Sequence, residues 1–159
     1  MKGEALVQWT VEMVLNRALL MENQSYNLYV WARDAVSNSD AKMFLNELAK
    51  EELEHKGKLS DALKNRKKIV DLGSDTKKIE DLKIIDWLRD TTLSESVTYQ
   101  EILIFVGKRE KATYEHYLNL SDISGQNEIG HLFYRLAQEE LKHKIRIEKE
   151  YDANILKEM

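Results

Sequence analysis

The chain repeats one nonapeptide at two distant places. LAKEELEHK covers residues 48–56 and LAQEELKHK covers residues 136–144, so the copies agree at seven of nine positions with an offset of 88 residues. The same offset relates Glu22 to Glu110, and no gap is needed to keep the two halves in register. The repeat therefore predicts two copies of one helical hairpin, with corresponding side chains at corresponding places in each half.

The composition favours long helices over a turn-rich β fold. The 159 residues include no proline and only six glycines, and 43% of them are hydrophobic. Apolar residues recur at helical spacing in four segments that are separated by polar breaks. The expected helices cover about residues 3–36, 40–65, 93–120 and 128–151.

The links between these helices predict the topology. SNSD at 37–40 supplies helix-capping side chains to a short first link, and SDISGQNE at 121–128 forms a short third link. The second link is long, about 27 residues, and contains a short predicted helix at 79–90. Short links join antiparallel neighbours, whereas a long link lets the chain cross the bundle. We predict an all-α four-helix bundle with a long crossover, in a single domain of residues 1–159.

Charge and hydropathy argue against several classes of function. The net charge is −4 and no basic block is present, so nucleic-acid binding has little support. No apolar run approaches the roughly 18 residues needed to span a bilayer. Glu4, Glu12 and Arg17 interrupt the region where a signal peptide would be apolar, so we expect a cytoplasmic protein. The absence of cysteine excludes disulfides and thiolate metal sites.

Each expected helix carries a glutamate in the middle of its apolar face, and two of these glutamates are followed by a histidine three residues later. A buried, unpaired carboxylate costs several kcal/mol, and four of them at one level would repel one another. No basic residue occupies a matching place on these faces, but two divalent cations would balance four carboxylates and two neutral imidazoles. The six candidate metal ligands are Glu22, Glu52, His55, Glu110, Glu140 and His143.

This ligand pattern resembles rubrerythrin-type members of the ferritin-like superfamily, in which two helices give one glutamate each and two give Glu-x-x-His. The resemblance covers nearly the whole chain and implies a ferritin-like bundle with two iron ions. It implies that Glu52 and Glu140 bridge the metals, that Glu22 and His55 bind one metal, and that the other two ligands bind the second. Manganese or zinc could also occupy such oxygen and nitrogen ligands.

Two departures from the family pattern bear on the expected activity. Rubrerythrins commonly carry a four-cysteine iron domain, but this chain has no cysteine, so the electron donor is expected to be another protein. They also commonly have an extra glutamate three residues after the third-helix ligand, where this chain has Thr113. The resemblance links that carboxylate to metal movement during peroxide reduction, so its absence argues against peroxidase activity.

Four tyrosines follow the single-glutamate ligands at matching places. Tyr26 and Tyr114 lie one turn past a ligand, and we expect them to hydrogen-bond a carboxylate or control access to the metals. Packing in the core is the alternative for this pair. Tyr29 and Tyr117 lie one turn further along, and we expect them to pack in the core.

The residues beside the bridging glutamates allow two interpretations. Glu51 and Glu139 could orient the imidazoles, but an ion-paired, solvated helix face is favoured for both. His116 has no histidine at its matching place, so we expect it at the surface.

The expected function is that of a redox protein that reacts with peroxide or dioxygen or oxidises ferrous iron. We expect it to form a homodimer. The alternatives are iron binding without turnover and a structural bundle with a vestigial metal site.

Overall fold

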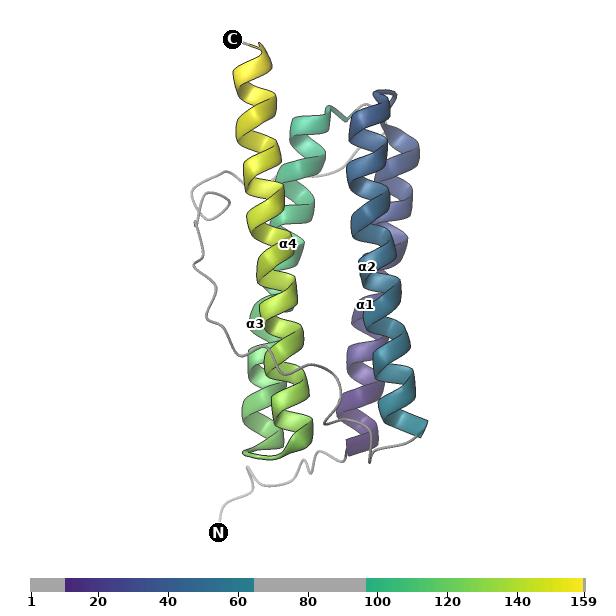
Figure 1. Ribbon diagram of the computed structural model, residues 1–159, viewed down its shortest axis with the longest axis vertical. Helices are drawn as coiled ribbons and strands as arrows, with labels where there is room; N and C mark the ends of the chain where they lie inside the picture. Colours follow the sequence, from purple (N-terminus) through teal and green to yellow (C-terminus); the bar gives the residue numbers. More distant parts are fainter. Residues whose placement is uncertain (1–10, 65–96, 159) are drawn as a thin grey trace.

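The computed structural model describes residues 11–64 and 97–158, which form four long helices and no strand (Figure 1). The helices are α1 Val11–Ala35, α2 Ser39–Lys64, α3 Tyr99–Ser124 and α4 Glu128–Glu158. α1 packs along α2, α3 packs along α4, and α1 also contacts α3. The predicted all-α four-helix bundle is therefore confirmed. None of the described helices has an apolar stretch long enough to cross a membrane.

The directions of the helices fit a crossover topology. α1 and α4 run one way along the bundle, and α2 and α3 run the other way (Figure 1). α2 ends at the opposite end of the bundle from the start of α3, so a short hairpin turn cannot join them. The predicted long link and its short helix at 79–90 lie outside the described residues.

Two helices extend further than predicted and one begins later. α3 begins at Tyr99 rather than near residue 93, because Thr98 and Glu101 form a capping box with backbone-to-side-chain hydrogen bonds of 3.1 and 2.9 Å. α3 and α4 continue past their predicted ends at residues 120 and 151. No proline or glycine follows Tyr151 to stop α4, and the residues there include good helix formers.

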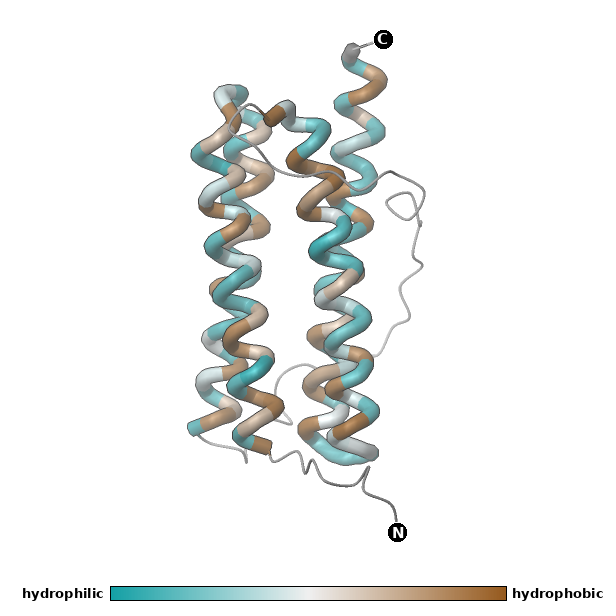
Figure 2. Tube along the Cα trace, turned by 180° about the vertical axis from the view of Figure 1, so that it is seen from behind, coloured by the Kyte–Doolittle hydropathy of each residue, from teal (hydrophilic) through white to brown (hydrophobic). Residues whose placement is uncertain are grey.

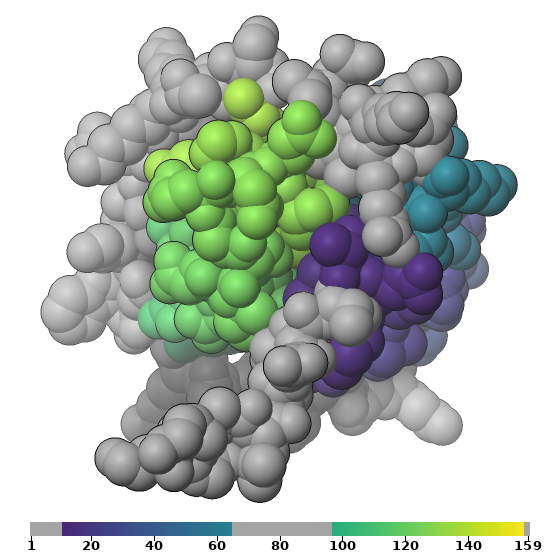
Figure 3. Space-filling view, turned by 90° about the horizontal axis from the view of Figure 1, so that it is seen from below, coloured from purple at the N-terminus to yellow at the C-terminus, as the bar shows by residue number. Residues whose placement is uncertain are grey.

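The turn between α3 and α4 depends on two glycines. Gly125 has a φ of 84°, which L side chains rarely adopt, and Asn127 then caps α4 by accepting a 2.9 Å hydrogen bond from the Gly130 amide. A Cβ atom on Gly130 would lie 1.9 Å from the Gly125 carbonyl oxygen, so only glycine fits there. The start of α1 lies beside this turn at the same end of the bundle (Figure 3).

The core consists of two apolar clusters with a polar layer between them. Apolar positions recur along every helix and alternate with polar ones (Figure 2). The first cluster surrounds Leu15, Tyr117 and Phe133, and the second surrounds Leu45 and Leu103. In each helix the candidate ligands stand between residues of the first cluster and residues of the second. The fold therefore places the six polar side chains at mid-height, closed off by apolar packing on both sides.

Candidate metal centre

Six buried side chains meet at this level of the bundle. Each is at most 3% exposed, and each helix contributes at least one of them. Residues three apart on a helix differ by about 60° around the axis and about 4.5 Å along it, so a Glu-x-x-His pair can reach one point. The structure brings together all six residues that the sequence singles out: Glu22, Glu52, His55, Glu110, Glu140 and His143.

The six side chains form two overlapping groups. The first consists of Glu22, Glu52, His55 and Glu140, and the second of Glu52, Glu110, Glu140 and His143. In each group, one ligand atom from every residue lies within 4.8 Å of the others. Glu52 and Glu140 belong to both groups, so they are placed to bridge two cations, and each group adds one glutamate and one histidine of its own.

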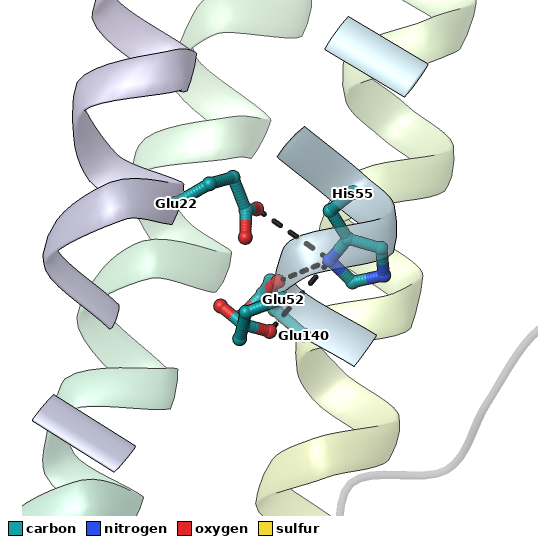
Figure 4. A group of neighbouring side chains, drawn as sticks. All are labelled: Glu22, Glu52, His55 and Glu140. Atoms are coloured by element: carbon teal, nitrogen blue, oxygen red, sulfur yellow. Dashed lines mark hydrogen bonds and ion pairs between the residues drawn. The ribbon is translucent and has the colours of Figure 1, made fainter. Parts of the chain in front are cut away.

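Figure 4 shows the first group, in which the ring of His55 turns Nδ1 toward three carboxylates. Nδ1 lies 3.1 Å from Glu140 Oε1. It lies 3.5 Å from Glu22 Oε1 and 3.6 Å from Glu52 Oε1. One nitrogen cannot bond all three oxygens, whereas a cation among these atoms would contact all of them.

The second group repeats this arrangement around His143. Its Nδ1 lies 2.9 Å from Glu52 Oε1, 3.6 Å from Glu110 Oε2 and 3.9 Å from Glu140 Oε2. The rings of His55 and His143 are stacked, with centroids 5.6 Å apart and planes 11° apart. Both rings therefore present the same nitrogen to the shared carboxylates, as the internal duplication predicts.

Several polar atoms of the site have no hydrogen-bond partner among residues 11–64 and 97–158. They are Glu22 Oε2, both carboxylate oxygens of Glu52, Glu110 Oε2 and His143 Nδ1, whose approach to Glu52 lacks hydrogen-bond geometry. A buried polar atom left unsatisfied costs about 1–3 kcal/mol, more if charged. Two divalent cations would bind these atoms and balance four carboxylate charges. Oxygen and nitrogen ligands suit iron, manganese or zinc, so the residues fit the predicted metal pair.

Burial and mutual repulsion change the acid–base properties of the site in the metal-free chain. Burial, with the charges of Glu22 and Glu110, raises the pKa of Glu52 well above its usual value. Burial, with the charges of Glu110 and Glu52, does the same to the pKa of Glu140. Burial also acts on Glu110, but contacts with Glu140 and His143 outweigh it and lower the Glu110 pKa. Burial would lower the pKa of His143, but Glu110 and neighbouring carboxylates raise it.

The stability of the metal-free protein should therefore fall as the pH rises from about 5.5 to about 8. Glu52, Glu140 and His143 keep protons in the folded state that the unfolded chain releases, above 4.5 for the carboxyls and above 6.5 for the imidazole. The lowered pKa values of Glu51 and Glu110 matter only at lower pH.

Urea unfolding at several pH values, with a chelator present, measures this slope. The metal-loaded protein should show the opposite slope, because cations compete with protons for the same groups. A metal-free stability that increases over this pH range would contradict the raised pKa values.

Two buried tyrosines bind the unshared carboxylates across the bundle. Tyr29 Oη donates to Glu110 Oε1 at 2.5 Å, and Tyr117 Oη donates to Glu22 Oε1 at 2.6 Å. Burial, together with the nearby carboxylates, raises the pKa of both phenols well above 10, so both stay protonated. Each hydroxyl thus fixes the orientation of a carboxylate on the opposite helix.

The prediction that Tyr29 and Tyr117 pack in the core is confirmed, because both belong to the apolar clusters, but their hydrogen bonds to the carboxylates were not foreseen from the sequence. A residue seven places after a ligand lies about 20° from it around the helix, while one four places after lies about 40° away. Aromatic side chains on helices lean toward the amino terminus, which brings these two phenols back to the level of the carboxylates. Tyr26 and Tyr114 are partly buried and pack against the second and first apolar clusters, respectively.

Glu51 contacts Nε2 of His143, the ring nitrogen that points away from the other carboxylates of the site. Its Oε1 lies 3.3 Å from His143 Nε2, and its Oε2 accepts a 2.6 Å hydrogen bond from Arg146 Nη1. The hydrogen bond with His143, together with that from Arg146, outweighs partial burial and lowers the pKa of Glu51 to about 2. The ionised carboxylate fixes the proton of His143 on Nε2, which leaves the lone pair of Nδ1 for a cation.

The matching residue in the other half has a different environment. Glu139 forms a 2.8 Å ion pair with Lys142, and the side chains of Glu139 and Lys142 are 38% and 45% exposed. The predicted ion pair is therefore found at both residues, with Lys142 at Glu139 and with Arg146 at Glu51, but Glu51 also contacts an imidazole, as the alternative interpretation foresaw. The difference arises from packing between helices, because Glu51 on α2 meets His143 and Arg146 on α4.

Glu51→Gln should weaken metal binding at the His143 position by about 10–100-fold, because the amide cannot fix the imidazole as a carboxylate does. Calorimetric titration of the full chain with metal measures this loss, and it should show that one of the two sites has a lower affinity while the other is unchanged. Glu139→Gln is the matched control and should bind both metals as the unaltered protein does. Equal affinities in the two variants would show that Glu51 does not position the ligand.

Thr113 lies where the family pattern has an extra glutamate. It is 4% exposed, and its hydroxyl contacts Glu140 Oε2 at 3.3 Å and the Glu110 carbonyl oxygen at 3.1 Å. The hydroxyl adds no charge, so the acidic side chains of the site remain four.

Comparison with known proteins agrees with this geometry. The family model described as Rubrerythrin matches residues 13–151, which include every candidate ligand and most of the 159 residues. No curated protein and no solved structure matches the chain. The resemblance expected from the ligand pattern is confirmed: the chain belongs to the rubrerythrin family.

Proposed function

We propose that the chain is a non-haem diiron-carboxylate redox protein that reduces peroxide or dioxygen, or oxidises ferrous iron, with electrons from an external donor. The observation that carries the proposal is the pair of overlapping four-residue groups that share Glu52 and Glu140. Membership of the rubrerythrin family supports iron as the metal. Bound iron would supply the electrons for cleavage of an O–O bond.

Each half of the chain serves both metal positions in this proposal. Glu52 and Glu140 would hold both cations, and the four remaining ligands would divide between the two positions. Glu22 and His55 serve the first, and Glu110 and His143 serve the second. Such an assignment uses every unpartnered polar atom that the four glutamates and two histidines present to one another.

The surrounding residues hold the ligands and exclude water. The phenol oxygens of Tyr29 and Tyr117 stay protonated and lie 2.5 and 2.6 Å from oxygens of the unshared carboxylates, which restrains those carboxylates. Glu51 restrains one imidazole. The apolar clusters above and below the polar layer keep bulk water away, which strengthens electrostatic interactions inside it.

Two partners complete the proposal. The 159 residues contain no cysteine and thus no thiolate iron site, so the electrons come from a donor outside these residues. We also propose a homodimer, since Trp31, Met43 and Leu53 expose 41%, 63% and 47% of their surface. Sedimentation equilibrium of the purified chain tests the dimer.

Anaerobic loading with ferrous iron, followed by rapid mixing with hydrogen peroxide or with dioxygen, tests the redox function. The iron spectrum should change with at least one oxidant, and added reductant should restore the starting spectrum over repeated cycles. Glu139→Gln serves as the control and should react at the unaltered rate. Spectra that neither oxidant changes would sink the proposal.

Iron binding without turnover is the second candidate, and Thr113 favours it. The site lacks the extra carboxylate that the family pattern associates with peroxide reduction, and a neutral hydroxyl contacts Glu140 instead. In that case iron would be oxidised once and stay bound, and the repeated cycles would fail. An assembly of many subunits would support storage, whereas a dimer would argue against it.

A further inference from the structure

A pocket of about 230 Å³ opens between α1 and α3, the two helices that carry no histidine ligand. Its walls include Arg17 and Met21 from α1 and Arg109, Thr113 and His116 from α3. The volume is below the range of about 300–1,000 Å³ typical of sites for drug-sized molecules, so a smaller ligand fits.

The pocket reaches from the surface to the side chains around the metal centre. Arg17 is exposed and marks the mouth, whereas Thr113 is 4% exposed and marks the inner wall. The Thr113 hydroxyl lies 3.3 Å from Glu140 Oε2, a carboxylate shared by both ligand groups. A molecule in the pocket is therefore separated from the centre by one side chain, on the side away from the imidazoles.

Within the described residues, the pocket walls carry two arginines and no carboxylate. Arg109 donates to Ser25 Oγ, the Met21 carbonyl oxygen and Gln24 Oε1, which are all neutral acceptors. Arg17 Nε donates to Nε2 of His116 at 3.4 Å. Neither arginine forms an ion pair with any residue in the described part of the chain.

The histidine in this pocket does not add a third positive charge to those of the two guanidinium groups. Burial, followed by the charges of Arg17 and Arg109, lowers the pKa of His116, so its ring is neutral at pH 7 and can accept the hydrogen bond from Arg17. The predicted surface position of His116 is therefore only partly right, because the ring is half-buried in the pocket wall. Two fixed guanidinium groups beside Met21 and Leu20 suit a ligand with one anionic end and a small apolar body.

We propose that this pocket binds a small organic carboxylate, with its anionic end at Arg17 and Arg109 and its apolar body toward Thr113. The binding itself is independent of metal, while its effect on the metal centre rests on the proposed function. The ligand would occupy the approach to the centre from the α1–α3 side.

Titration of the metal-free full chain with sodium benzoate at constant ionic strength, followed by amide NMR shifts, tests the binding. The shifts should saturate and be largest in residues 17–24 and 109–116. Arg17→Gln should weaken binding by about fivefold or more, and benzamide, the neutral isostere, should bind correspondingly weakly. Lys58→Gln, an exposed α2 residue outside the pocket, is the control and should bind benzoate normally.

Shifts that do not saturate, or benzoate binding that Arg17→Gln leaves unchanged, would overturn the proposal. A second measurement uses cobalt-loaded protein, whose visible spectrum should change on addition of benzoate in the unaltered chain and much less in Arg17→Gln. Saturable binding with an unchanged cobalt spectrum would overturn the placement beside the metal. Failure of cobalt to bind would instead refute the proposed function, and the metal-free titration would still decide the carboxylate site.

Discussion

Removal of bound metal should lower the melting temperature of the protein by about 10–20 °C. Each site filled at 100 times its dissociation constant adds about 2.7 kcal/mol of stability, and a chain of this size changes by about 2–4 °C per kcal/mol. The loss would be large because the burial and mutual repulsion of the four acidic side chains would then no longer be offset by bound cations. Differential scanning calorimetry before and after exhaustive chelation measures it.

Re-addition of ferrous iron or manganese provides the control for this experiment and should restore the original melting temperature. Calcium should restore much less, because it prefers six to eight oxygen ligands and the site includes two imidazoles. Identical melting temperatures with and without metal would favour a structural bundle with a vestigial site.

Glu140→Gln should have opposite effects on the two forms of the protein. In the metal-free chain at pH 8 the variant should be more stable by about 1 kcal/mol or more, since each unit of raised pKa corresponds to about 1.4 kcal/mol. In the presence of metal it should be far less stable than the unaltered protein, because both cations lose a shared ligand. Urea unfolding with and without metal measures both effects.

The neighbouring Glu139→Gln is the matched control, since Glu139 lies outside the ligand groups, is partly exposed and pairs with Lys142. It should change neither curve appreciably. If Glu140→Gln destabilised the metal-free chain instead, Glu140 would contribute a structural interaction that outweighs repulsion from Glu52 and Glu110, and the electrostatic account of the cluster would be wrong.

The convergence of the ligands could be predicted because it follows from local periodicity and duplication. Glu-x-x-His places both side chains on one helix face, and the 88-residue offset places a second copy in the same register. The position of the ligands at mid-height in the bundle could also be predicted, because apolar residues precede and follow each ligand along its own helix. Helix ends were less predictable, because the start of α3 depends on the capping box of Thr98 and Glu101.

Contacts between helices could not be read from the sequence in the same way. Glu51 and Glu139 occupy equivalent positions in the sequence repeat. Glu51 contacts a histidine of the neighbouring helix α4, whereas Glu139 pairs with a lysine of its own helix. Lys144 and Glu148 have the spacing of a common surface ion pair, but they bind at 3.1 Å while fully buried. Such differences depend on rotation and spacing of packed helices, which periodicity does not specify.

The most direct test of the metal centre is a crystal structure of the iron-loaded chain with anomalous data at the iron edge. Two anomalous peaks about 3.5–4 Å apart are expected, as in two-metal sites generally. Glu52 and Glu140 should contact both peaks, with Nδ1 of one histidine at each. Peaks absent from the space between these six side chains, with the carboxylates hydrogen-bonded only to one another, would contradict the account.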